Sequence, residues 1–127
     1  MSDMTSQEKV RIAAHAALAK FAEDPVILDV REVVSFADYL LIVTGQSNRQ
    51  VKAITDGIDE AVTRHGERPI GTEGYHEGRW ILMDLNDVIV HVFQKEVRQR
   101  YDLERLWSDA DAVDLGLDES GDREAIS

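Results

Sequence analysis

The sequence contains no cysteine, and this absence removes three classes of site at once. A chain without cysteine has no disulfide framework, no thiolate zinc site and no cysteine nucleophile. The absence also fits a reducing compartment. No apolar run reaches the roughly 20 residues that a membrane-spanning helix needs, and the first residues lack the apolar core of a signal peptide. We therefore expect a protein of the cytoplasm.

Basic residues are also scarce, with 14 Lys and Arg against 25 Asp and Glu, for a net charge of −11. A protein that neutralises phosphates needs clustered lysine and arginine, so this balance disfavours direct nucleic-acid binding. Residues 108–127 hold seven of the acids and one base, and the rest of the chain holds 18 acids and 13 bases. Such a surface favours a basic protein partner, mainly through association rate and selectivity.

Two helices carry start signals in the sequence. Thr5 and Glu8 have the spacing of a capping box, and apolar residues follow at helical spacing to about residue 22, after which Pro25 ends the helix. Ser47 and Gln50 predict a second capping box, with a helix that continues to a glycine stop near residue 66.

Strands are predicted at residues 26–30, 39–44, 80–85 and 88–93, with a short edge strand near 69–72. The run at 39–44 is continuously apolar, which is typical of a central strand covered on both faces. A last helix runs from 94 to 107, with a break near Asp102. The order α-β-β-α-β-β-α predicts an α/β (α+β) domain at 1–107, with a mixed sheet flanked by helices. The acidic residues 108–127 predict a flexible tail.

The segment 80–93 predicts a β-hairpin with a defined register. Asn86 and Asp87 suit a two-residue turn, because both residue types tolerate a positive φ. Alternation then places six apolar residues on the core face: Ile81, Met83, Leu85, Val88, Val90 and Val92. The opposite side, which we call the outer hairpin face, carries Trp80, Leu82, Asp84, Ile89, His91 and Phe93.

Two interpretations of the outer hairpin face remain open at this point. A helix could cover it, which would make Trp80 and Phe93 ordinary core residues. Alternatively, it is an exposed apolar patch edged by polar groups, which is typical of a partner site. Tryptophan at the centre of such a patch is a common binding hot spot, and Asp84 would then meet a lysine or arginine of the partner.

Three other features could carry chemistry, but each has a simpler explanation. The turn at 44–47 lacks a Walker lysine and a G-x-G-x-x-G pattern, so Ser47 fits a helix cap better than a phosphate site. Asp84 and Asp87 could bind a divalent metal, but their spacing crosses the hairpin turn. The four histidines show no two-histidine metal spacing, and no Ser or Cys nucleophile lies beside His91 in the sequence. We expect no catalytic residue, cofactor or metal.

The ordered motifs of the chain resemble those of the Iojap-type ribosomal silencing factors. Each motif alone is common, but their conjunction from about residue 28 to 107 is specific. The motifs are Asp38-Tyr39, Thr44-Gly45-x-Ser47-x-Arg49-Gln50-Val51, Glu73-Gly74, Trp80-x-x-x-Asp84, Asp87-Val88-Ile89-Val90-His91-x-Phe93 and Arg98-x-x-Tyr101-x-Leu103-Glu104-x-Leu106-Trp107.

The resemblance implies a mixed-sheet fold related to nucleotidyltransferases, usually a homodimer, and no catalysis. Members of this family bind the large ribosomal subunit through ribosomal protein L-fourteen and sterically block its association with the small subunit, which represses translation when nutrients are short. Carried over by motif, the contact surface comprises Trp80, Leu82, Asp84, His91, Arg98 and Tyr101. The alternative is a nucleotidyltransferase-like enzyme that retains nucleotide and metal binding. Against it, the chain lacks a Gly-Ser followed by a paired Asp-x-Asp on a strand.

Overall fold

The computed structural model describes residues 4–102, 105, 107 and 109–113. Their elements are α1 (Ser6–Ala19), β1 (Glu23–Asp29), β2 (Tyr39–Gly45), α2 (Asn48–Arg64), β3 (Gly71–Glu73), β4 (Trp80–Asp84), β5 (Val88–Gln94), α3 (Lys95–Tyr101) and β6 (Asp111–Ala112). The strands form one sheet in the order β3-β4-β5-β2-β1-β6. β2 and β5 are parallel, and the other neighbouring strands are antiparallel. The predicted mixed sheet with flanking helices is therefore confirmed.

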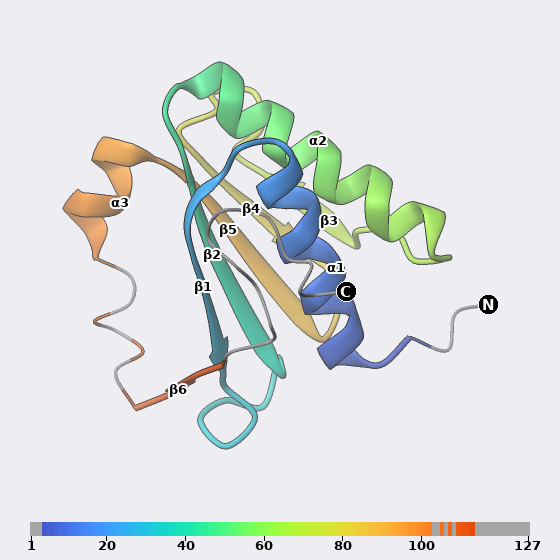
Figure 1. Cartoon of the computed structure of the whole chain (residues 1–127). Helices are drawn as coiled ribbons and strands as arrows, with labels where there is room; N and C mark the ends of the chain where they lie inside the picture. Colours follow the sequence, from blue (N-terminus) through green and yellow to red (C-terminus); the bar gives the residue numbers. More distant parts are fainter. Residues whose placement is uncertain (1–3, 103–104, 106, 108, 114–127) are drawn as a thin grey trace.

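Helices cover the two faces of the sheet unequally (Figure 1). α1 and α2 lie together on one face, above the six residues predicted for the core side of the hairpin, and all six are buried. On the opposite face α3 contributes Val97 to a second apolar cluster with Leu40, Ile42 and Phe93. β2 is buried along its whole length, as its continuous apolar run predicts.

The two helix starts differ in how far they follow the prediction. At α1, Thr5 accepts from the Glu8 N–H and Glu8 accepts from the Thr5 N–H, so the capping box is confirmed. At α2, Ser47 accepts from the Gln50 N–H, but the Gln50 side chain does not bond back to Ser47. Its amide instead accepts from the Gln46 N–H and donates to the carbonyls of Lys20 and Phe21. The prediction of a second capping box is thus wrong in its reciprocal half, because Gln50 joins the start of α2 to the end of α1.

The end of the first helix also differs from the prediction. α1 ends at Ala19, and Phe21 turns the chain with a left-handed φ of 67°. Pro25 lies inside β1, so the prediction that Pro25 ends the helix is wrong. The pairing register of β1 shifts between Glu23 and Val26. Proline is accommodated at such a β-bulge, where the regular ladder is already interrupted.

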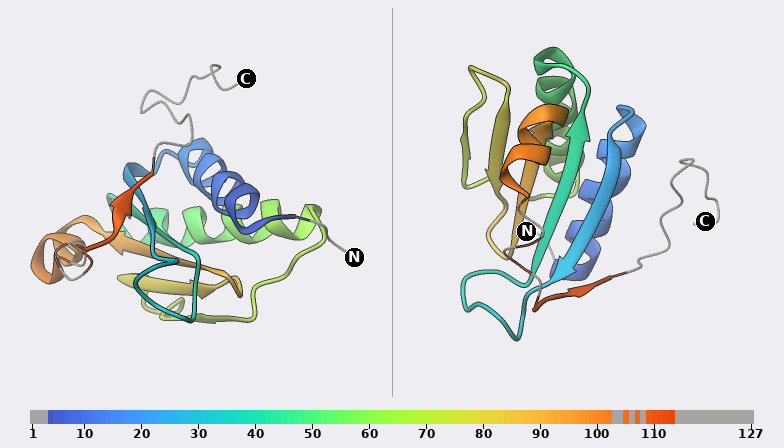
Figure 2. Two further views of the ribbon diagram at one scale, coloured as in Figure 1. Left: turned by 90° about the horizontal axis from the view of Figure 1, so that it is seen from below. Right: turned by 90° about the vertical axis from the view of Figure 1, so that its left-hand side faces the viewer.

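The break predicted near Asp102 is confirmed, since α3 ends at Tyr101 and Asp102 adopts a left-handed φ of 47°. β6 lies within the segment predicted as a flexible tail and pairs with β1 at the sheet edge (Figure 2, left). The remainder of that tail, residues 114–127, lies outside the described residues. Among the described helices, none combines the length and apolar character required to cross a bilayer.

Candidate functional site

The hairpin of β4 and β5 has the register that its sequence predicts. Trp80 pairs with Phe93, Leu82 with His91, and Asp84 with Ile89. The turn residue Asn86 adopts a positive φ of 82°, and the Leu85 N–H donates to the Val88 carbonyl at 2.9 Å. The outer hairpin face therefore carries the six residues that were predicted for it.

Trp80 stands at the centre of an aromatic cluster on this face. Its ring centroid lies 4.8 Å from that of Phe93 and 5.1 Å from that of Tyr101, both in tilted geometry. Phe93 is fully buried, whereas Tyr101 is 52% exposed. α3 follows β5 without a loop. Tyr101 at its end therefore lies next to the hairpin and packs against Trp80 on the outer side of the cluster. Tilted pairs at these separations are favourable for aromatic rings.

His91 holds Trp80 in place. The Trp80 indole Nε1–H donates to His91 Nδ1 at 3.0 Å. His91 is only 8% exposed, and burial lowers its pKa to about 4. The imidazole is therefore neutral near pH 7, with Nδ1 free of a proton as the hydrogen bond requires. The motif resemblance predicts a partner contact for His91, whereas in the structure its ring is buried and accepts the hydrogen bond of the Trp80 indole.

Asp84 and Arg98 lie apart from the aromatic cluster. Asp84 is at the turn end of the hairpin, about 13 Å along β4 from Trp80, and its Oδ1 accepts from the Asn86 N–H at 2.9 Å. Arg98 donates to the Asp24 carbonyl and to Thr44 Oγ1, both at 2.7 Å, and so is directed toward β1 and β2. Of the six predicted site residues, the structure brings together Trp80, Leu82, His91 and Tyr101.

The outer hairpin face is covered along one strand and more open along the other. α3 covers the β5 side, where Phe93 and His91 are buried. On the β4 side Trp80, Leu82 and Asp84 are only half-buried. Viewed from this side, β3 and β4 lie beside α3, and none of the described helices crosses in front of them (Figure 2, right). The open part is a strip of β4 with the aromatic cluster at one end.

Comparison with known proteins identifies the family. Residues 3–126 match the family described as "Ribosomal silencing factor during starvation". The chain belongs to this family. It is 44% identical over 112 residues to the ribosomal silencing factor RsfS of Bacillus subtilis, covering 88% of this chain and 95% of that protein.

Two solved structures agree with this assignment. A crystal structure from Chromobacterium violaceum superimposes with a TM-score of 0.81 at 36% identity, covering 83% of this chain and 88% of the other. One from Bacillus halodurans gives a TM-score of 0.77 at 38% identity, with coverage of 86% and 99%. Ribosomal silencing factor is the name of a regulatory protein, and the expected family resemblance is confirmed.

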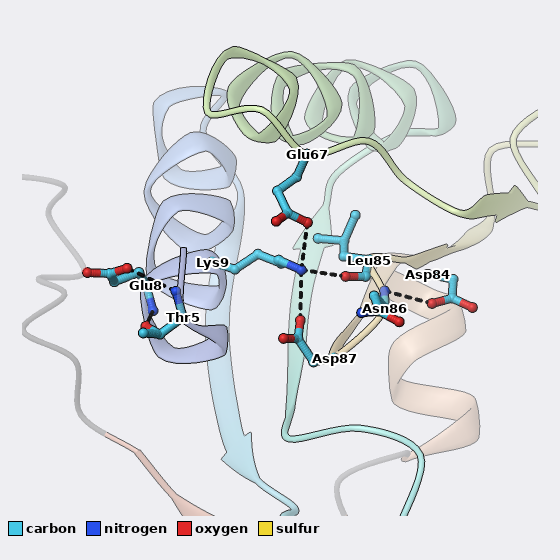
Figure 3. A network of polar contacts seen from close by, with 8 residues as sticks. All are labelled: Thr5, Glu8, Lys9, Glu67, Asp84, Leu85, Asn86 and Asp87. Carbon is cyan, nitrogen blue, oxygen red and sulfur yellow. Dashed lines mark hydrogen bonds and ion pairs between the residues drawn. The ribbon is translucent and has the colours of Figure 1, made fainter. Parts of the chain in front are cut away.

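The carboxylates that could have supported an enzyme have structural partners in this member of the silencing-factor family. Asp84 bonds the turn backbone and Asp87 bonds Lys9, and the two carboxylates point to different sides of the turn (Figure 3). Within the described residues, no group of three or more potential metal ligands of the His, Cys, Asp or Glu type occurs. The Gly45 turn is explained by packing, because a Cβ there would lie 2.9 Å from the Val51 side chain.

Lys9 was not foreseen, and it fixes the hairpin in this fold. Although it is only 2% exposed, its Nζ lies 2.8 Å from the Leu85 carbonyl, 2.8 Å from Asp87 and 3.0 Å from Glu67 (Figure 3). Burial alone would lower the pKa of Lys9, but the bonds to Asp87 and Glu67 outweigh it and raise that pKa. The sequence does indicate that Lys9 is buried, because it precedes Ala13 by four residues and therefore lies on the same apolar helix face.

Proposed function

We propose that this protein represses translation by binding the large ribosomal subunit through ribosomal protein L-fourteen and sterically blocking association with the small subunit. Membership of the silencing-factor family supports the ribosomal role. The structural observation that carries the docking surface is the aromatic cluster beside the open strip of β4. We also propose that the protein acts as a homodimer in the cytoplasm.

The geometry of Trp80 suits a binding hot spot. A half-buried indole that is already fixed by Phe93, Tyr101 and His91 loses little side-chain freedom on docking. Its open edge, together with Leu82, offers apolar surface that a partner can desolvate. The net charge of −11 favours a basic ribosomal protein over bare RNA as the contacted component.

Co-sedimentation with purified large subunits tests the surface. Trp80→Ala is expected to weaken binding roughly thirtyfold, corresponding to about 2 kcal/mol for a hot-spot truncation. Tyr101→Ala removes an exposed wall of the cluster with little effect on folding, and should weaken binding by a smaller factor. Phe36→Ala is the matched control, because Phe36 is an equally apolar exposed aromatic in the loop between β1 and β2. Unchanged binding of both cluster variants would overturn the proposed surface.

A subunit-joining assay tests the mechanism separately. Large subunits saturated with the protein should fail to form complete ribosomes with small subunits, and Trp80→Ala should restore joining at the same protein concentration. If saturated large subunits join normally, steric blocking is wrong even though binding stands.

A further inference from the structure

A hollow of about 260 Å³ lies beside Trp80 on the outer face and is lined by Glu73, Gly74, Trp80 and Leu82. Its wall is set by the sheet register, because Glu73 of β3 pairs with Leu82 of β4 and cross-strand partners project to the same side. Gly74 keeps the chain close to β4. It has a φ of 83°, and a Cβ there would lie 2.3 Å from the Trp80 carbonyl oxygen.

The hollow combines an apolar floor with a carboxylate that has no cationic partner among the described residues. Trp80 and Leu82 provide the floor, and Glu73 is exposed at the rim. Asp84 and Asp87 differ from Glu73, because each already bonds a donor of the hairpin or of α1. Glu73 is therefore a better candidate than Asp84 for pairing with a basic residue of the partner.

We propose that this hollow receives a lysine or arginine side chain of the partner protein. The methylene stem of such a residue packs on Leu82 and the Trp80 ring, and its cationic head bonds Glu73 at the rim. Long basic side chains have this division into an apolar stem and a charged tip. The inference rests on the proposed function and names the chemistry by which the same surface recognises its partner.

Binding of purified large ribosomal subunits to Glu73→Gln tests the inference. The variant keeps the shape of the rim and removes its charge, so binding should weaken roughly five- to tenfold at low salt. Glu73→Lys should weaken it further through repulsion. The loss for Glu73→Gln should shrink in about 1 M salt, where charges are screened within roughly 3 Å. Glu60→Gln is the matched control. Glu60 is an exposed glutamate on α2, and α2 packs on the face of the sheet opposite to the hollow.

The outcomes separate the inference from the proposed function. If Glu73→Gln and Glu73→Lys bind like the wild type while Trp80→Ala loses binding, the hollow receives no cation and the docking surface stands. An equal loss in Glu60→Gln would indicate a general charge effect and would also overturn the inference. If the wild type itself fails to bind large subunits, the proposed function and the inference both fail. Thermal unfolding of the Glu73 variants checks that they fold. Their midpoints should equal that of the wild type, because Glu73 lies exposed on an edge strand.

Discussion

Lys9 shows how a single charge can fix the position of a distant turn. Its ammonium joins α1 to the hairpin turn through Leu85 and Asp87 and to the chain after α2 through Glu67. The carboxylates keep partial contact with water, since Asp87 is 34% and Glu67 25% exposed, which reduces the cost of burying the group. The bond from Lys9 Nζ to the Leu85 carbonyl is the fully buried part of this network.

Lys9→Met should destabilise the protein by about 2–4 kcal/mol, because it leaves two carboxylates and a buried carbonyl without their donor. Urea unfolding measures this free energy. Adding Asp87→Asn and Glu67→Gln to Lys9→Met should restore part of the loss by removing the uncompensated charges. Arg64→Met, which breaks only an exposed pair at 3.7 Å, is the control and should cost less than about 0.5 kcal/mol. A loss as small in Lys9→Met would show that the network contributes no stability.

His91 makes stability depend on pH. Its folded pKa of about 4 lies below the ordinary value of 6.5, because burial disfavours the charged ring. Between these two values the unfolded chain binds a proton that the folded chain excludes, so the free energy of unfolding falls as pH falls. The contribution of this group should decrease by about 2 kcal/mol from pH 7 to pH 5. Urea unfolding of His91→Gln should show a shallower decrease over that range, and parallel curves for the two proteins would contradict the assignment.

The hairpin turn is the element whose details the sequence predicted best. Turn length and alternation are local properties, so the pairing of Trp80 with Phe93 and of Leu82 with His91 followed from a short segment. The sequence did not predict which residues of these strands are buried under α3, because that depends on where α3 packs after β5. Lys9 and Gln50 bond residues distant in the sequence, so helical periodicity places these side chains on a helix face but does not predict their partners. β6 is only two residues long, which is too short for a periodic pattern. For the site, the sequence predicted the face but not which side of it is open.

Asn86 tests the local part of this argument. Its φ of 82° is strained for most side chains, and its own side chain is exposed. Asn86→Val should therefore cost about 1–2 kcal/mol through backbone strain alone, while Asn86→Gly should be close to neutral. Thermal or urea unfolding distinguishes the two variants. Equal stability of the valine and glycine variants would show that the turn relaxes into another conformation.

At the scale of the whole molecule, the sheet extends past the boundary proposed for the domain. β6 pairs with β1 through Leu28–Ala112 and Asp29–Asp111, and the Val113 N–H donates to the Ile27 carbonyl at 2.9 Å. Val113 also packs on the core cluster beneath α1. These contacts cover the edge of β1 at residues 27–29, which would otherwise be part of a free sheet edge.

Two truncated chains locate the end of the folded unit. A chain ending at residue 107 loses β6 and should unfold with about 1–2 kcal/mol less free energy than the full chain, because it loses edge hydrogen bonds and the packing of Val113. A chain ending at residue 113 keeps these contacts and should match the full chain in urea unfolding. Both keep the aromatic cluster, so large-subunit binding should persist in each. If the shorter chain is as stable as the longer, β6 adds nothing to the domain and the boundary at residue 107 is correct.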